Sequence, residues 1–307
     1  MPLTIWRSAT VTGDCPVTNT YTLTAEQRDT FKRSGILRLD GLLPAQRVRH
    51  AREAVLRPLE RLGLWQAGAW RLDAMPRPQW PDTGLKTSQV IGNRHPELAA
   101  LVEDSALAAA VDALLEGHPY ERPGPNRRPQ VLFTLPNAQT WTVPSGWHSD
   151  RPRLASGQSA GVQLFAFLDV VEARGGGTLA IAGSHHLLNE GRAIRPSQFG
   201  RLLRPKPFFA DLMVADTAAD SLQRRADLLQ RTGAVGNVQL QIVEMTGAPG
   251  DVWLMDLRVL HVGSPNAADR PRMMLTFRYE RSDLLPEVAS AFGWRRAAIP
   301  NSARNLA

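Results

Sequence analysis

From Gln130 onward, the hydrophobic pattern of this chain of 307 residues changes to short apolar runs separated by Gly, Pro, Asn and Asp. Each run is long enough for one strand and too short for a helix of ordinary length. Many short strands with such turns pack as a sandwich or jelly roll. We therefore expect a mostly β barrel over residues 130–282, with strands at 131–135, 139–143, 161–168, 178–181, 238–243, 251–255 and 272–281.

The part of the chain before the barrel has helical spacing. Thr24 is placed to cap a helix over 25–34, with Gln27 three positions after the cap and Gly35 as its C-terminal stop. Apolar residues recur at helical intervals over 44–62 and 96–116, and Asp104 and Ser105 can cap a new start inside the second region. Residues 24–120 are thus predicted to form a helical scaffold that flanks the barrel.

Two segments depart from these patterns. Trp65, Trp70 and Trp80 lie in a Pro-rich stretch that ends near Gln89, which predicts an ordered loop whose aromatic side chains pack on the barrel or border its mouth. Residues 185–236 are rich in Arg and Leu, with helical spacing over 218–231. We interpret them as a lid-like insertion between the two halves of the barrel.

Composition limits the class of protein. A hydrophobic fraction of 43% over this length allows a sizeable core, and we expect one domain over 1–307. A single cysteine, Cys15, excludes an internal disulfide framework. The first residues lack a signal-peptide layout, and no apolar run approaches the roughly 18 to 20 residues that span a bilayer. These features favour a cytoplasmic protein with no membrane partner.

The formal charge of +7 raises the question of a nucleic-acid partner. Of the 36 basic residues, the lysines are Lys32, Lys86 and Lys206, so 33 are arginine. The arginines are scattered and form no tract with interleaved aromatic residues, so nucleic acid is not expected. An ordinary arginine-rich surface explains the excess, and attraction of an anionic substrate is the functional alternative.

The stretch TVPSGWHSD carries the chemistry. His148 and Asp150 are two positions apart at the end of a strand-like run, and therefore share one face. With one more histidine, this pair makes the two-histidine, one-carboxylate triad that holds Fe(II) and leaves coordination positions open. His261, which follows the apolar run 252–255, is the preferred third ligand, and His185 and His186 are its rivals.

The order of these motifs resembles a known family. Arg272 follows His261 by eleven residues, and the phrases FKRSGILRLDGLLP (31–44), GGGTLAIAGSHH (175–186) and GDVWLMD to DRPR (250–272) complete the pattern. Together they are similar to the phytanoyl-CoA dioxygenase family of Fe(II)- and 2-oxoglutarate-dependent oxygenases. The resemblance implies a double-stranded β-helix, which is a jelly-roll or cupin-like barrel. It also implies Fe(II), 2-oxoglutarate and O2, and ligation through His148, Asp150 and His261 rather than through the GSH histidine.

The resemblance also assigns the cosubstrate site. Arg272 is expected to hold the distal carboxylate of 2-oxoglutarate, because guanidinium offers a planar fork for two carboxylate oxygens. Arg270 is chemically equal, but the arginine of the family occupies the last position of DRPR. Thr178 and Gln163 are either further cosubstrate partners or satisfied sheet residues. The chain departs from some members of the family at Leu135 and Gly263.

The expected reaction follows from Asp150. Similar iron halogenases replace this carboxylate with a small residue, so its presence favours hydroxylation of an unactivated C–H bond of a small molecule, with release of succinate and CO2. Two alternatives remain: a metal-binding barrel that binds ligands without turnover, and an oxygenase that modifies a macromolecule. The sequence identifies neither the substrate nor the oligomeric state.

Overall fold

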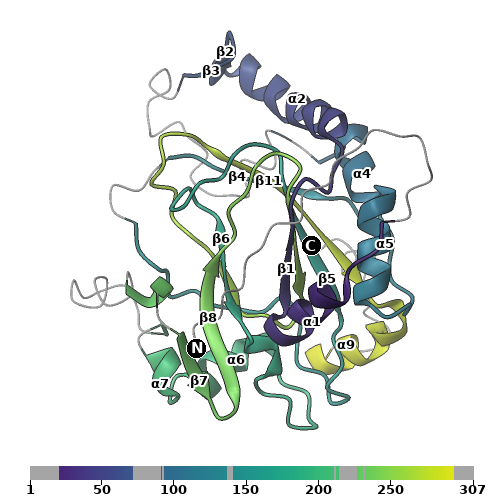
Figure 1. Cartoon of the computed structure of the whole chain (residues 1–307), viewed down its shortest axis with the longest axis vertical. Coiled ribbons are helices and arrows are strands. Elements are labelled where there is room, and N and C mark those ends of the chain that lie inside the picture. Colours follow the sequence, from purple (N-terminus) through teal and green to yellow (C-terminus); the bar gives the residue numbers. More distant parts are fainter. Residues whose placement is uncertain are drawn as a thin grey trace.

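Two antiparallel sheets face each other in the computed structural model (Figure 1), which describes residues 21–71, 91, 93–136, 141–210, 212–213, 227–230 and 232–293. The larger sheet has the strand order β1 (Ile36–Leu39), β9 (Val252–Asp256), β5 (Gly161–Phe167), β11 (Arg272–Glu280) and β4 (Gln130–Thr134). The smaller has the order β10 (His261–Gly263), β6 (Thr178–Ala182), β8 (Val238–Glu244) and β7 (Thr232–Val235). Strands β2 (Trp65–Gln66) and β3 (Ala69–Trp70) pair separately.

The helices lie outside these sheets. Those before the barrel are α1 (Ala25–Ser34), α2 (Ala45–Arg61), α4 (Pro96–Val102) and α5 (Ser105–Leu114). Those within and after it are α6 (Pro196–Leu203), α7 (Pro207–Ala210) and α9 (Leu285–Phe292), with 3-10 turns at Ser184–His186, Asp227–Gln230 and Ser282–Leu284. Among the described residues, no helix has the length and apolar character that crossing a membrane requires.

The space between the two sheets is filled by apolar side chains. Phe165 on β5 is paired in register with Trp253 on β9, and Phe167 is paired with Met274 on β11. These side chains share one core cluster with Ala180 of the opposite sheet. Because side chains alternate along a strand, every second residue of β11 faces this interior, beginning with Arg272. The interior therefore places polar residues of β11 beside an otherwise apolar core.

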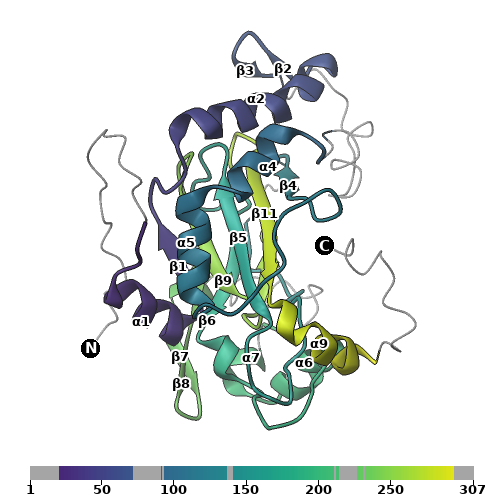
Figure 2. The ribbon, with the colours of Figure 1, turned by 90° about the vertical axis from the view of Figure 1, so that its right-hand side faces the viewer.

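The outer faces of the sheets are covered by separate helical layers. Figure 2 shows α2, α4 and α5 along the larger sheet, where Leu164 and Leu254 join the core cluster of those helices. Phe199 of α6 and Phe209 of α7 cluster with Leu179 of the smaller sheet. The described part of the predicted insertion thus covers an outer face. Its role as a lid stays a prediction.

The barrel and its helical scaffold confirm the sequence-based expectation of a double-stranded β-helix with flanking helices. The helix over 25–34 has the predicted bounds, with a capping box at Thr24 and Gln27. The strand predicted at 139–143 is wrong for 141–143, which have no strand structure, and 139–140 lie outside the described residues. Strands β2, β3, β7 and β10 were not predicted. Of the helix expected over 218–231, only 227–230 lie within the described residues, where they form a 3-10 turn. Trp80 lies outside the described residues.

Gly35 joins the helical layer to the barrel. It ends α1 in the left-handed conformation, with φ of 74°. A Cβ atom at this position would lie 2.5 Å from Nδ1 of His185 and 2.6 Å from a methyl group of Val259. The sequence needs glycine here for two reasons, the positive φ and the close approach of two neighbouring turns.

Gly41 provides the control for a prediction about Gly35. It also has a positive φ, of 61°, but a Cβ there would meet no atom within 4 Å. Gly41→Ala should therefore cost about 1 kcal/mol from backbone strain alone. Gly35→Ala should cost roughly 1 to 3 kcal/mol more, because the new methyl group is also overpacked. Urea unfolding of both variants measures the difference, and equal free energies of unfolding would contradict the packing described here.

Candidate metal centre

Two backbone hydrogen bonds bring the predicted metal ligands together. The amide of His148 donates to the carbonyl oxygen of His261 at 3.1 Å, and the amide of His261 donates to that of His148 at 2.8 Å. This isolated antiparallel bridge extends the smaller sheet beyond β10. Asp150 follows His148 by two residues, so the two side chains lie on the same face of this segment.

The three side chains converge on one point. Nε2 of His148 lies 4.0 Å from Oδ1 of Asp150, and Nε2 of His261 lies 3.6 Å from Oδ2. Each residue offers one ligand atom, and these three atoms all lie within 4.8 Å of one another. Within the described part of the chain, they form the one such group of His, Cys, Asp and Glu. Two imidazoles and a carboxylate match the donor set that binds Fe(II) with open positions.

The backbone fixes which nitrogen of each imidazole faces the centre. Nδ1 of His148 lies 3.0 Å from the carbonyl oxygen of Gly146, and Nδ1 of His261 lies 3.1 Å from that of Val259. A carbonyl can only accept, so Nδ1 carries the proton in both rings. In the neutral ring, Nε2 then carries the lone pair and faces Asp150, which is the arrangement that metal-binding histidines use.

Charge at the centre also suits a cation. Burial lowers the pKa of His261 and keeps its ring neutral. Burial opposes ionisation of Asp150, but the charge that His261 carries when protonated and the Arg278 guanidinium lower the pKa of Asp150 to about 2. Nε and Nη2 of Arg278 both lie 2.9 Å from Oδ2 of Asp150. Arg278 therefore fixes one carboxylate oxygen and leaves Oδ1 as the oxygen nearer to His148.

The three side chains of the centre differ in exposure. The side chain of His148 is 52% exposed, whereas those of Asp150 and His261 are 14% and 8% exposed. Phe165 stands edge-on to the His261 ring, with ring centroids 6.4 Å apart, and forms an apolar wall on the barrel side. Among the described residues, the centre is therefore most accessible on the side of His148 and most buried on the side of His261.

Arg272 is a buried cation without a counterion in the described part of the chain. Its guanidinium donates to the carbonyl oxygen of Gly176 and to Oγ1 of Thr134, while its Nε has no partner. Burial lowers its pKa to about 10. No carboxylate among the described residues forms an ion pair with it. A buried charge of this kind is costly unless an anion accompanies it, so the site favours an acidic ligand.

Gln163 and Thr178 also line the interior, as their strand positions require. Nε2 of Gln163 donates to Oγ1 of Thr276 at 3.1 Å, while Oε1 is buried without a partner. Thr178 is 3% exposed and shares its face of β6 with Ala180, a member of the interior cluster. Their contact with a cosubstrate stays a prediction. Because Oε1 of Gln163 is an unused acceptor, Gln163 is the stronger of the two candidates for a cosubstrate contact.

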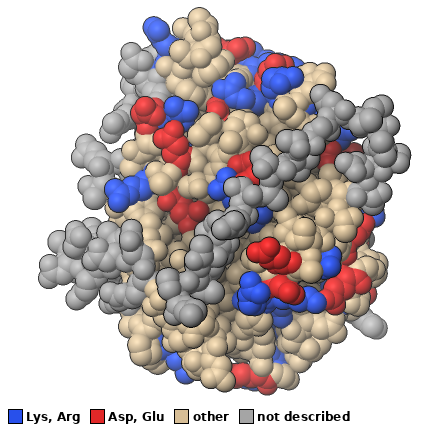
Figure 3. All heavy atoms as spheres, viewed as in Figure 1, with Lys and Arg blue, Asp and Glu red and all other residues tan. Residues whose placement is uncertain are grey.

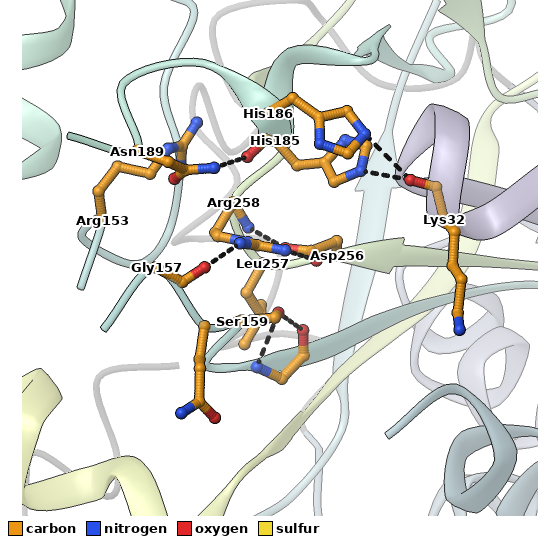
Figure 4. Close-up of polar contacts among 12 residues, drawn as sticks. Lys32, Arg153, Gly157, Ser159, His185, His186, Asn189, Asp256, Leu257 and Arg258 are labelled. Atoms are coloured by element: carbon orange, nitrogen blue, oxygen red, sulfur yellow. Dashed lines mark hydrogen bonds and ion pairs between the residues drawn. The ribbon is translucent and has the colours of Figure 1, made fainter. Parts of the chain in front are cut away.

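The rings of His185 and His186 both face the backbone of Lys32 (Figure 4). Nε2 of each ring lies 3.0 Å from the carbonyl oxygen of Lys32, at the end of α1. Burial lowers the pKa of His185 to about 4, so it is a neutral packing residue. This placement favours His261 over both rivals as the third ligand.

Sequence reasoning missed the role of Arg278, although alternation along β11 puts it on the face of Arg272.

Comparison with protein families gives one result that covers most of the chain. The family described as Phytanoyl-CoA dioxygenase (PhyH) matches residues 31–274. That range includes each of the predicted ligands and Arg272. No curated protein sequence matches the chain.

Solved structures with a similar fold share little sequence with the chain. The non-heme alpha ketoglutarate dependent carbocyclase SnoK from nogalamycin biosynthesis is 20% identical, with a TM-score of 0.51 and coverage of 85% of each chain. HygX from Streptomyces hygroscopicus, with nickel and 2-oxoglutarate bound, is 17% identical, with a TM-score of 0.49 and coverage of 85% and 88%. EctD from S. alaskensis with 2-oxoglutarate and 5-hydroxyectoine is 20% identical, with a TM-score of 0.47 and coverage of 87% and 79%. At this identity the carbocyclase shows the shared fold alone.

The geometry predicts which histidine substitution removes the metal. His261→Ala should weaken Fe(II) binding more than about 100-fold, because loss of even an outer partner of a metal ligand costs 10- to 100-fold. His185→Ala should leave Fe(II) affinity unchanged, since its ring contacts Lys32 and not the centre. Anaerobic equilibrium dialysis of the two folded variants measures this. Normal iron retention in His261→Ala together with loss in His185→Ala would reverse the assignment.

Proposed function

The chain belongs to the phytanoyl-CoA dioxygenase family, and we propose that it is an Fe(II)- and 2-oxoglutarate-dependent oxygenase that hydroxylates an unactivated C–H bond of a small molecule. One observation carries the proposal. A two-histidine, one-carboxylate group and a buried arginine with no ion pair among the described residues occur in the same barrel. The first fits the metal, and the second fits the carboxylate of the cosubstrate.

Fe(II) and O2 would be held by residues that are already in position. Nε2 of His148, Nε2 of His261 and one oxygen of Asp150 would bind Fe(II), and O2 would use an open position of this donor set. When bound, the iron supplies oxidative decarboxylation of 2-oxoglutarate to succinate and CO2, coupled to oxygen insertion into a C–H bond. The protein supplies orientation, charge and exclusion of water around that chemistry.

Arg272 would bind the distal carboxylate of 2-oxoglutarate. Its Nε is free, and its other contacts to Gly176 and Thr134 hold the guanidinium in a fixed plane. A fixed guanidinium loses little conformational entropy when it pairs with a carboxylate. A purely structural metal site has no use for such a residue, so Arg272 also argues against a barrel without turnover.

Arg278 and Asp150 support hydroxylation. The guanidinium of Arg278 stabilises the ionised carboxylate and restricts its rotation, so that Oδ1 is available as a ligand. Asp150 would occupy the coordination position that halide takes in the similar iron halogenases, where a small residue replaces the carboxylate. A carboxylate held in this way favours transfer of oxygen over transfer of halide to the substrate.

Arg272→Ala tests the cosubstrate site. Loss of one partner from a buried charge pair costs about 2 to 5 kcal/mol, which corresponds to roughly 30-fold or more weaker 2-oxoglutarate binding. Iron affinity should be nearly unchanged, because Arg272 contacts none of the three ligands. Anaerobic titration of the Fe(II)–2-oxoglutarate charge-transfer absorbance measures the affinity.

Arg270→Ala is the matched control for this experiment. Its side chain is 43% exposed and lies near Asp269 at the surface, so its loss should change 2-oxoglutarate affinity little. Equal affinities of the unmodified chain and Arg272→Ala would reject the cosubstrate assignment. Absence of the absorbance band in the iron-loaded unmodified chain would favour a barrel that binds metal without turnover.

A further inference from the structure

A cavity of about 330 Å³ opens beside the metal centre, where strand β4 begins. The last β11 residue that pairs with β4 is Thr276, opposite Gln130, the first residue of β4. Strand β11 continues beyond it to Glu280 without a β4 partner. The connector before β4 folds over this free edge, and Nη2 of Arg127 donates to the carbonyl oxygen of Arg278 at 2.9 Å. We call this space the arginine cavity; its polar lining includes Arg94, Arg127, Arg128, Gln130, Thr276 and Arg278.

Arg278 connects the arginine cavity to the candidate ligands. The residue lines the cavity, and its guanidinium binds Asp150 at 2.9 Å. Thr276 lines the cavity as well and accepts a hydrogen bond from Gln163 inside the barrel. A molecule in the cavity therefore lies one side chain away from the metal centre. Its volume falls within the usual range for small-molecule sites.

The charge of the arginine cavity is positive on balance. Among the residues that the structure describes, its lining includes four arginines and no Asp or Glu. Arg127 pairs with Glu280, and Arg278 pairs with Asp150. Arg94 and Arg128 have no ion pair among the described residues. On the face in Figure 3, by contrast, basic and acidic side chains are interspersed.

The arrangement is also chemically specific. Nε of Arg128 donates to the carbonyl oxygen of Pro125 at 2.8 Å, which anchors the guanidinium and leaves its terminal nitrogens available. Side-chain amides of Asn93, Asn126 and Gln130 add further donors around the same space. Guanidinium and amide donors together suit the oxygen atoms of a carboxylate or a phosphate group.

We propose that the arginine cavity binds an acidic group of the substrate, either carboxylate or phosphate, and so presents the rest of that molecule to the metal centre. The proposal rests on the proposed function, because it assigns a substrate class to that reaction. The cavity is distinct from the cosubstrate site. Arg272 and Arg278 are six residues apart on one strand face, which places their backbones about 20 Å apart.

A binding experiment with two simple anions tests the proposal. The full chain is loaded with Zn(II) in place of iron and saturated with 2-oxoglutarate, so that the Arg272 site is filled. Inorganic phosphate is then titrated by broadening of its phosphorus NMR line, and benzoate by ligand-detected proton NMR. The anion that binds more tightly distinguishes a phosphate from a carboxylate substrate. Failure of both anions to bind the unmodified chain would overturn the proposal.

The decisive variant is Arg94→Gln/Arg128→Gln, which removes the two unpaired cations of the cavity. We expect the preferred anion to bind at least ten-fold more weakly, with the affinity for 2-oxoglutarate unchanged. The control Arg49→Gln/Arg201→Gln makes the same charge change at exposed helix positions, where neither residue has an ion pair among those described, and should bind the anion normally.

The possible failures are distinguishable. Equal anion affinity in the cavity variant and the unmodified chain, with 2-oxoglutarate bound normally, would overturn the arginine cavity and leave the proposed function standing. An equal loss in the cavity variant and the control would also overturn it, because the effect would then reflect net charge alone. Failure of the unmodified chain to bind 2-oxoglutarate would overturn the proposed function and this proposal with it.

Discussion

The site depends on the pair of backbone hydrogen bonds between His148 and His261. These bonds join two segments that are distant in the sequence, and they set the separation of the two imidazoles before any metal binds. The ring centroids are 4.5 Å apart. Asp150 then completes the group because of its position two residues after His148. An arrangement held by backbone costs little reorganisation when the metal arrives, which favours binding.

Strand β11 supplies two arginines on which the proposed site depends, Arg272 and Arg278. Its interior face begins with Arg272, continues through Met274, Thr276 and Arg278, and ends with Glu280. The two arginines serve different partners: Arg278 fixes Asp150, while Arg272 remains without a counterion among the described residues. A single strand can do both because alternate side chains along it face one space. Strands β5 and β4 pair with it on its two sides and hold it in place.

The sequence predicted the ligand group because part of its signal is local and the rest lies in the order of its motifs. His148 and Asp150 are two residues apart, and the order of motifs up to Arg272 resembles one family. Boundaries of the main helices were predictable for the same reason, since Thr24 and Gly35 act within one turn. The structure places these features where the motifs indicate.

Other features depend on contacts that no local pattern encodes. Strand β10 has only three residues, and pairing with β6 defines it. The segment 141–143 has strand-like composition, yet Trp141 and Val143 pack into the outer cluster without a sheet partner. The Arg278–Asp150 pair joins residues 128 positions apart. Burial and long-range pairing decide these points, so they required the folded chain.

The most direct test of the account is a crystal structure of the anaerobic complex with Fe(II) and 2-oxoglutarate, with the iron located by its anomalous scattering. The account predicts iron bound by Nε2 of His148, Nε2 of His261 and one oxygen of Asp150, and the distal carboxylate of 2-oxoglutarate paired with Arg272. Iron at His185 and His186, or the distal carboxylate of 2-oxoglutarate in the arginine cavity rather than at Arg272, would contradict it.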